Sequence, residues 1–210
     1  MMMTDSEKST FFSAARQILY CVGCIGVTFL EHAIAAIYKE KTFDENGIME
    51  NFQLGELLLA CALFLSISFC RKAFHRMGII FAALSATAAC RELDNVFDNL
   101  IPVIGWKFAF LFIALAVGYA IKNWQKTLEE LLKFFRHPSF PRMCCAIPVI
   151  IPIGQCIGHK SFVVNILQME HIGSIKEFVE ESIETAGYFI LICSAIELFW
   201  PRKTSTDLPV

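Results

Sequence analysis

The segment Cys90-Arg91-Glu92-Leu93-Asp94-Asn95-Val96-Phe97-Asp98 decides the fold, because it continues an apolar run that starts near residue 77. Four of its residues are charged, at depths where a membrane helix is still expected to lie in lipid. An ionised side chain there costs roughly 2–3 kcal/mol even on the mildest scale. Each of these charges therefore needs a partner inside the protein or a function.

The composition of the whole chain agrees with a membrane protein. Hydrophobic residues make up 56% of the 210 residues and charged residues only 18%, with 20 phenylalanines. A soluble domain usually carries about 25% charged residues. The formal net charge of −2 argues against nucleic-acid binding, since no basic cluster is large enough to offset it.

The apolar runs predict an all-α, polytopic bundle with six membrane spans, a leader at residues 1–17 and a tail at 201–210. The predicted spans cover residues 18–38, 51–70, 77–96, 103–121, 144–167 and 181–200. Residues 122–137 mix apolar and charged side chains in the pattern of an amphipathic helix on the membrane surface. The span at 144–167 carries Pro148 and Pro152, so we expect it either to cross with a kink or to re-enter.

Lysine and arginine in the short loops predict the orientation. Twelve of them fall in the leader, the tail and alternate loops, whereas the intervening loops hold only Lys39, Lys41, Lys160 and Lys176. Both termini are therefore expected in the cytoplasm.

The ionisable residues of the predicted spans gather at one depth, near the extracytoplasmic surface. Helical spacing puts Arg91, Asp94 and Asp98 on one face, and Glu181 and Glu184 on another. The candidate site is a charge network of Glu31, His32, Glu56, Arg91, Glu92, Asp94, Asp98, Lys107, His159, Glu181 and Glu184. Because acids outnumber fixed cations, either some carboxyls hold protons or a bound cation balances them.

Three functions are compatible with this layer. The first is a structural or partner-binding membrane component, in which the charges fix helix register and the partner is another membrane protein or a second copy of the chain. The second is a metal-dependent intramembrane lipid hydrolase, with His32, His159, Glu181 and Glu184 as candidate ligands of a divalent metal. The third is a cation or proton-coupled transporter. Catalytic residues are not assigned, and in all three cases the bilayer is the surrounding partner.

The nine cysteines lie mostly inside apolar runs, where they are expected to be small packing residues. Cys21 and Cys24 match the C-x-x-C spacing, but no second pair accompanies them. We therefore interpret Cys21 and Cys24 as packing residues and not as a redox or zinc site.

Three short motifs carry a resemblance. Glu50-Asn51-Phe52-Gln53 begins the second predicted span, Arg91-Glu92-Leu93-Asp94 ends the third, and Glu180-Glu181-Ser182-Ile183-Glu184 lies in the last. This combination resembles a group of uncharacterised bacterial polytopic inner-membrane proteins. The resemblance covers the second to the sixth span and implies an inner membrane with the outer face toward the periplasm. It implies no activity.

Overall fold

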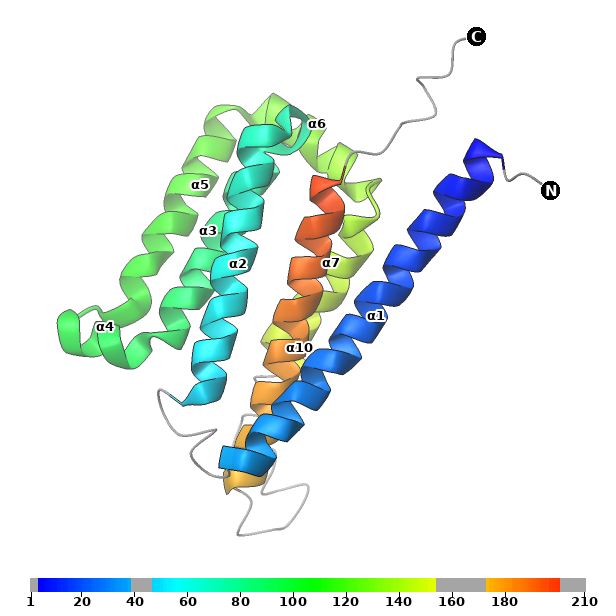
Figure 1. The fold of residues 1–210 in the computed structure, drawn as a ribbon. Helices are drawn as coiled ribbons and strands as arrows, with labels where there is room; N and C mark the ends of the chain where they lie inside the picture. Colours follow the sequence, from blue (N-terminus) through cyan, green and yellow to red (C-terminus); the bar gives the residue numbers. More distant parts are fainter. Residues whose placement is uncertain (1–3, 39–46, 154–172, 201–210) are drawn as a thin grey trace.

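The computed structural model describes residues 4–38, 47–153 and 173–200, and these form helices and connecting turns without a strand (Figure 1). The long helices are α1 (Asp5–Tyr38), α2 (Ile48–Cys70), α3 (His75–Glu92), α5 (Phe110–Lys122) and α10 (Gly173–Phe199). The shorter ones are η2 (Lys72–Phe74), α4 (Asp94–Leu100), η3 (Gly105–Ala109), α6 (Trp124–Phe135), α7 (Ser139–Pro148) and η4 (Val149–Ile153). The prediction of an all-α bundle is confirmed for these residues.

Five helical segments of the described chain are long and apolar enough to cross a membrane. They are Thr10–Tyr38, Ile48–Cys70, Lys72–Glu92, Gly105–Lys122 and Phe178–Phe199. Helices suit this environment because lipid offers no hydrogen bonds, so each backbone group must be satisfied within its own segment. By their length and composition, these are the helices of a membrane protein.

The predicted span at 144–167 is described only in part. Its first half forms the end of α7 and the π-helical turn η4, and Pro148 lies inside α7. Residues 154–167 lie outside the described part of the chain. The question of a kinked or re-entrant segment therefore stays a prediction.

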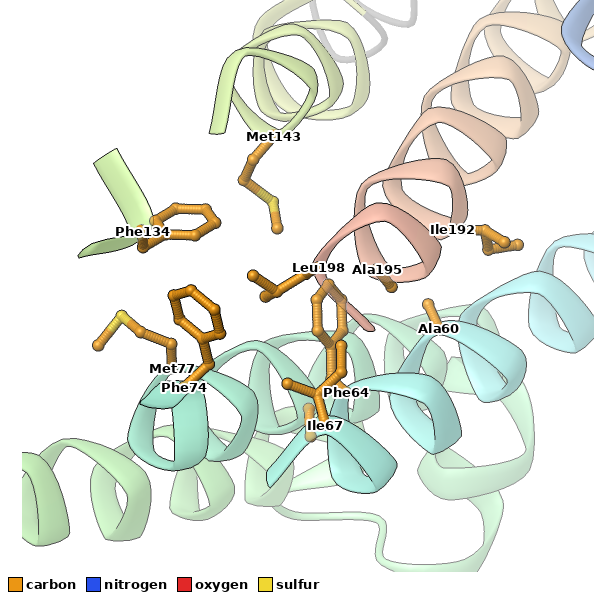
Figure 2. Close-up of a cluster of buried hydrophobic side chains, with 11 residues drawn as sticks. Ala60, Phe64, Ile67, Phe74, Met77, Phe134, Met143, Ile192, Ala195 and Leu198 are labelled. Carbon is orange, nitrogen blue, oxygen red and sulfur yellow. The ribbon is translucent and has the colours of Figure 1, made fainter. Parts of the chain in front are cut away.

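The core lies where α2, α3 and α10 meet, and α6 and α7 close it at one end (Figure 2). Phe64 of α2 and Leu198 of α10 are completely buried there. A Cβ atom at Gly78 of α3 would lie 2.7 Å from the Phe64 carbonyl oxygen, so only glycine permits this close approach of α2 and α3. The core therefore depends on a backbone-to-backbone contact as well as on large side chains.

Helix α6 packs against the end of the bundle through Thr127, Glu130 and Phe134, which are buried. The carboxylate of Glu130 accepts hydrogen bonds from the backbone N–H groups of Arg76 (2.6 Å) and Met77 (3.3 Å), and it pairs with the Arg76 guanidinium at 2.9 Å. These N–H groups belong to the first turn of α3 and have no acceptor in their own helix. The amphipathic segment thus caps a neighbouring helix.

Helix α1 packs mainly against α10 and stands at the edge of the bundle (Figure 1). At Gly23 an added Cβ would lie 2.6 Å from the Phe189 ring, which marks the closest approach of the two helices. The beginning of α1 and the end of α10 lie at the same end of the molecule. That end also holds the turn between α2 and α3 and helix α6.

Candidate functional site

The polar side chains at the opposite end of the bundle come from four different helices. This acidic cluster consists of Glu31 of α1, Glu56 of α2, Arg91 and Glu92 of α3, and Glu181 and Glu184 of α10. It lies near the end of α1 and α3 and near the beginning of α2 and α10. Six of the eleven predicted site residues therefore come from helix segments that share one depth.

Arg91 is the positive centre of the acidic cluster. Its Nη2 donates to Glu184 Oε2 at 2.9 Å and to Glu92 Oε1 at 3.0 Å. The Tyr188 hydroxyl also donates to Glu92 Oε1, at 2.8 Å. Arg91 therefore joins α3 to α10, the pairing that sequence spacing suggested for it.

Gln53 makes the corresponding link between α2 and α10. Its Nε2 donates to Glu181 Oε2 at 2.6 Å, to the Glu181 carbonyl oxygen at 3.1 Å and to Thr185 Oγ1 at 3.2 Å. Gln53 is fully buried and was not among the predicted site residues. The sequence offered one signal for including Gln53 in the site, because it lies one turn before Glu56 in an apolar span.

Glu31 and Glu56 differ from the rest of the acidic cluster because no lysine or arginine of the described residues forms an ion pair with either of them. They are 1% and 7% exposed, and they lie close enough to interact electrostatically. The hydroxyls of Ser182 and Thr185 of α10 lie within interaction distance of the Glu31 carboxylate, but no hydrogen bond of normal geometry joins either of its oxygens to a described donor. The same is true of Glu56 Oε2 and Glu184 Oε1.

Asp94, Asp98 and Lys107 are exposed and are not brought into the acidic cluster. The predicted shared face of Arg91, Asp94 and Asp98 assumed an unbroken helix. Helix α3 instead ends at Glu92, because Asp94 Oδ1 accepts the N–H of Asn95 at 2.6 Å and a new helix starts there.

Helix α4 then turns away from the axis of α3 (Figure 1). This turn places Asp98 against Gly105 at the start of η3. The backbone φ of +55° at Gly105 suits glycine, and the carboxylate leaves no room there for a Cβ atom. Lys107 forms no ion pair with Asp94 or Asp98.

The histidines do not add to this arrangement within the described residues. His32 is exposed, its Nδ1 hydrogen-bonds with the Thr28 carbonyl oxygen at 2.8 Å, and its ring meets Phe178 edge-on. His159 lies outside the described part of the chain. No three side chains of His, Cys, Asp or Glu among the described residues are placed to hold a metal ion.

A second polar cluster lies at the other end of α1 and α10, and we call it the arginine clamp. Arg16 Nε and Nη2 donate to the two oxygens of Glu197 at 2.8 and 2.9 Å. Arg142 of α7 lies 4.0 Å from the same carboxylate, and the Tyr20 hydroxyl donates to it at 3.3 Å. Glu197 was not among the predicted site residues, and its bidentate pair with Arg16 was not predicted.

The eight cysteines of the described residues carry free thiols, and Cys21 is exposed whereas Cys24 is half-buried. We found no matching family model, curated protein or solved structure. The resemblance to bacterial inner-membrane proteins therefore stays a prediction. Any functional conclusion depends on the chain's own geometry.

Proposed function

We propose that this multi-pass membrane protein binds a monovalent cation, the proton included, between Glu31 and Glu56 of the acidic cluster. The observation that carries the proposal is the set of buried carboxylate oxygens without a donor on these two residues. An ion held in a low-dielectric interior costs several kcal/mol unless a counter-charge neutralises it. A proton or a small cation supplies that counter-charge.

The charge balance of the acidic cluster supports the same conclusion. Five glutamates share one guanidinium, and Arg91 is already committed to Glu92 and Glu184. Networks that serve structure alone usually satisfy nearly all their buried polar atoms. Acidic side chains inside membrane segments commonly mark ion sites and proton relays.

The chemistry of the facing groups favours a monovalent cation over a divalent metal. The described residues bring no three candidate metal ligands together, whereas Glu31 and Glu56 interact electrostatically, with the hydroxyls of Ser182 and Thr185 near Glu31. The lipid-hydrolase hypothesis would need ligands from elsewhere, and His159 lies outside the described part of the chain.

The test uses the purified full chain in detergent, with Na⁺ replaced by choline at constant ionic strength. Calorimetric titration with NaCl detects Na⁺ uptake, and infrared difference spectra between acidic and alkaline buffer detect protons taken up by carboxyl groups. We expect one of these signals in the parent protein, and Glu31→Gln or Glu56→Gln should weaken it roughly tenfold or more. Glu129→Gln, at an exposed carboxylate of α6, is the control.

Two results would overturn the proposal. One is the absence of both a saturable Na⁺ signal and an infrared carboxyl signal in the parent protein. The other is a signal that Glu31→Gln and Glu56→Gln leave as strong as the control does.

Whether binding leads to transport is decided by flux in sealed vesicles that contain a pH-sensitive dye. The two polar clusters lie at opposite ends of the bundle, with the apolar core close to the arginine clamp, and this favours binding without flux. In that case the protein acts as a partner-binding membrane component, and Arg91 and Gln53 hold α10 in register with α3 and α2. Cation-dependent flux would instead assign it to the transporters.

For the location, we propose a bacterial inner membrane, six spans and cytoplasmic termini. The support is the positive-inside pattern, since Arg71, Lys72 and Lys122 lie at the end of the bundle where α1 begins. Reporter fusions after residues 100, 137 and 210 test this. Cytoplasmic reporter activity is expected at 137 and 210 only.

A further inference from the structure

An apolar groove runs along the outside of α3, between α2 and α5. Both of these helices pack on α3, and Figure 1 shows α3 lying between them. The groove has a volume of about 340 Å³, at the lower end of the roughly 300–1,000 Å³ typical of ligand pockets. Its lining includes Cys61 and Leu65 of α2, Ala83 and Ala86 of α3, and Phe112 and Ala116 of α5.

The alanines explain why the groove exists. The side chains of α3 and α5 that line the groove are mostly alanines, each with a single methyl group. The larger side chains of Leu65 and Phe112 lie beside them, and the difference in size leaves the groove. Empty space of this kind loses dispersion contacts unless something fills it. In a bilayer the groove is open to hydrocarbon chains.

Polar groups close one end of the groove. One turn beyond Ile79 and Ala116, His75 Nε2 and the Tyr119 hydroxyl are hydrogen-bonded at 3.1 Å, which joins α3 to α5. Three residues further along the chain on each side are Lys72, in the turn η2, and Lys122, the last residue of α5, which are both exposed. Neither lysine forms an ion pair with an acidic residue of the described chain.

Arg76 is the exception among the basic residues at this end. Its guanidinium lies 5.6 Å from the centre of the Tyr119 ring, but Glu130 neutralises its charge. Next to the His75–Tyr119 pair, Lys72 and Lys122 therefore carry positive charge that no described acidic residue neutralises.

We propose that this groove binds one anionic phospholipid, with an acyl chain against the alanines of α3 and the phosphate group between Lys72 and Lys122. The order along the groove is methyl groups, then a hydroxyl and an imidazole, then two ammonium groups. A phospholipid has the matching order of hydrocarbon, ester and phosphate. Basic pockets between membrane helices select anionic headgroups in this way. The site is independent of the cation proposed for the acidic cluster.

The experiment reconstitutes the full chain in nanodiscs of equal phosphatidylethanolamine and phosphatidylglycerol. Native mass spectrometry after release then counts the phospholipids retained per chain. We expect one retained lipid, with phosphatidylglycerol preferred. The double variant Lys72→Gln/Lys122→Gln should reduce that preference about fivefold per lysine, whereas Lys133→Gln on α6 should not.

Filling the groove tests the acyl-chain half of the site. Ala83→Leu/Ala86→Leu should remove the retained lipid whichever headgroup it carries, whereas Ala114→Leu, on an exposed face of α5, should keep it. The proposal is wrong if the parent chain retains both lipids equally or if the lysine variants keep the full preference. It is also wrong if a second protein chain occupies the groove and excludes lipid. The lysine variants decide the question even if the leucine variant fails to fold.

Discussion

The acidic cluster and the arginine clamp lie at opposite ends of α1 and α10, and they differ in their charge balance. In the clamp, one buried carboxylate, Glu197, receives two donors from Arg16 and lies beside Arg142. Among the described residues of the acidic cluster, Arg91 is the one cation beside five carboxyls and pairs with two of them, and Glu31 and Glu56 keep oxygens without donors. The first arrangement is complete in itself, whereas the second needs a further positive charge.

The supply of hydrogen-bond donors to the buried carboxylates therefore separates a structural contact from a binding site. Both clusters are buried ion networks, so burial or charge alone does not distinguish them. What distinguishes them is whether each carboxylate oxygen has a donor, since an unsatisfied buried group carries its full desolvation cost. The comparison therefore predicts opposite responses to neutralising a glutamate in the two places.

The largest effect is expected from Arg91→Met. Removal of the guanidinium leaves Glu92 and Glu184 buried without their cation, which should lower the free energy of unfolding by about 3–5 kcal/mol. Unfolding in mixed micelles with increasing sodium dodecyl sulfate measures the change. Arg136→Met, at an exposed site of α6, is the matched control. If both variants unfold alike, Arg91 does not hold the acidic cluster together.

Glu197→Gln should have the next largest effect. The amide keeps the shape of the side chain but loses the charge that receives Arg16 and attracts Arg142. We expect a loss of about 2–3 kcal/mol in the same unfolding assay, because hydrogen bonds to charged groups are the strong ones. Glu129→Gln should change little. A loss below about 1 kcal/mol would show that the clamp contributes no more than an exposed ion pair does.

Glu31→Gln should have the smallest effect and the opposite sign. A neutral amide at this buried position removes a charge that no described donor compensates. The free energy of unfolding should stay constant or rise by up to about 1 kcal/mol. Measured beside Glu197→Gln, this variant tests the comparison directly. A loss larger than about 1 kcal/mol would mean that the carboxylate of Glu31 is a structural partner after all.

The helices were largely predictable because lipid imposes one simple requirement on an apolar run. The predicted spans at 18–38, 51–70 and 103–121 overlap with apolar helices of the structure to within a few residues at most of their ends. Hydropathy reports this requirement directly, and the internal hydrogen bonding of helices meets it. Boundaries were least certain where polar residues lay within the run.

Neighbour relations were less predictable. Spacing placed Arg91 and Glu184 at one depth on inward faces, and that was enough to suggest their contact. Spacing did not predict the position of Glu130. Its neighbours Glu129 and Lys133 suggest the solvated face of an amphipathic helix, but Glu130 is buried against α3. The pattern along one helix predicts which face is buried and at what depth in the membrane. It does not predict which helix packs against that face.

The helix end at Leu93 shows a local signal that spacing alone overlooks. No proline or glycine interrupts this segment, yet Asp94 and Asn95 favour turns through short side-chain contacts with the backbone. Recognition of that preference would have removed Asp94 and Asp98 from the predicted network. Asp98 instead contacts the turn that starts at Gly105.

The position of α1 has a consequence for biogenesis. The ion-pair partner of Arg16 lies on α10, so it is synthesised 181 residues later than Arg16. During translation α1 therefore reaches the bilayer before α10 exists, and Glu31 enters lipid unmatched, at a cost of roughly 2–3 kcal/mol if it is ionised. A chain truncated before α10 therefore keeps Arg16 without its partner Glu197.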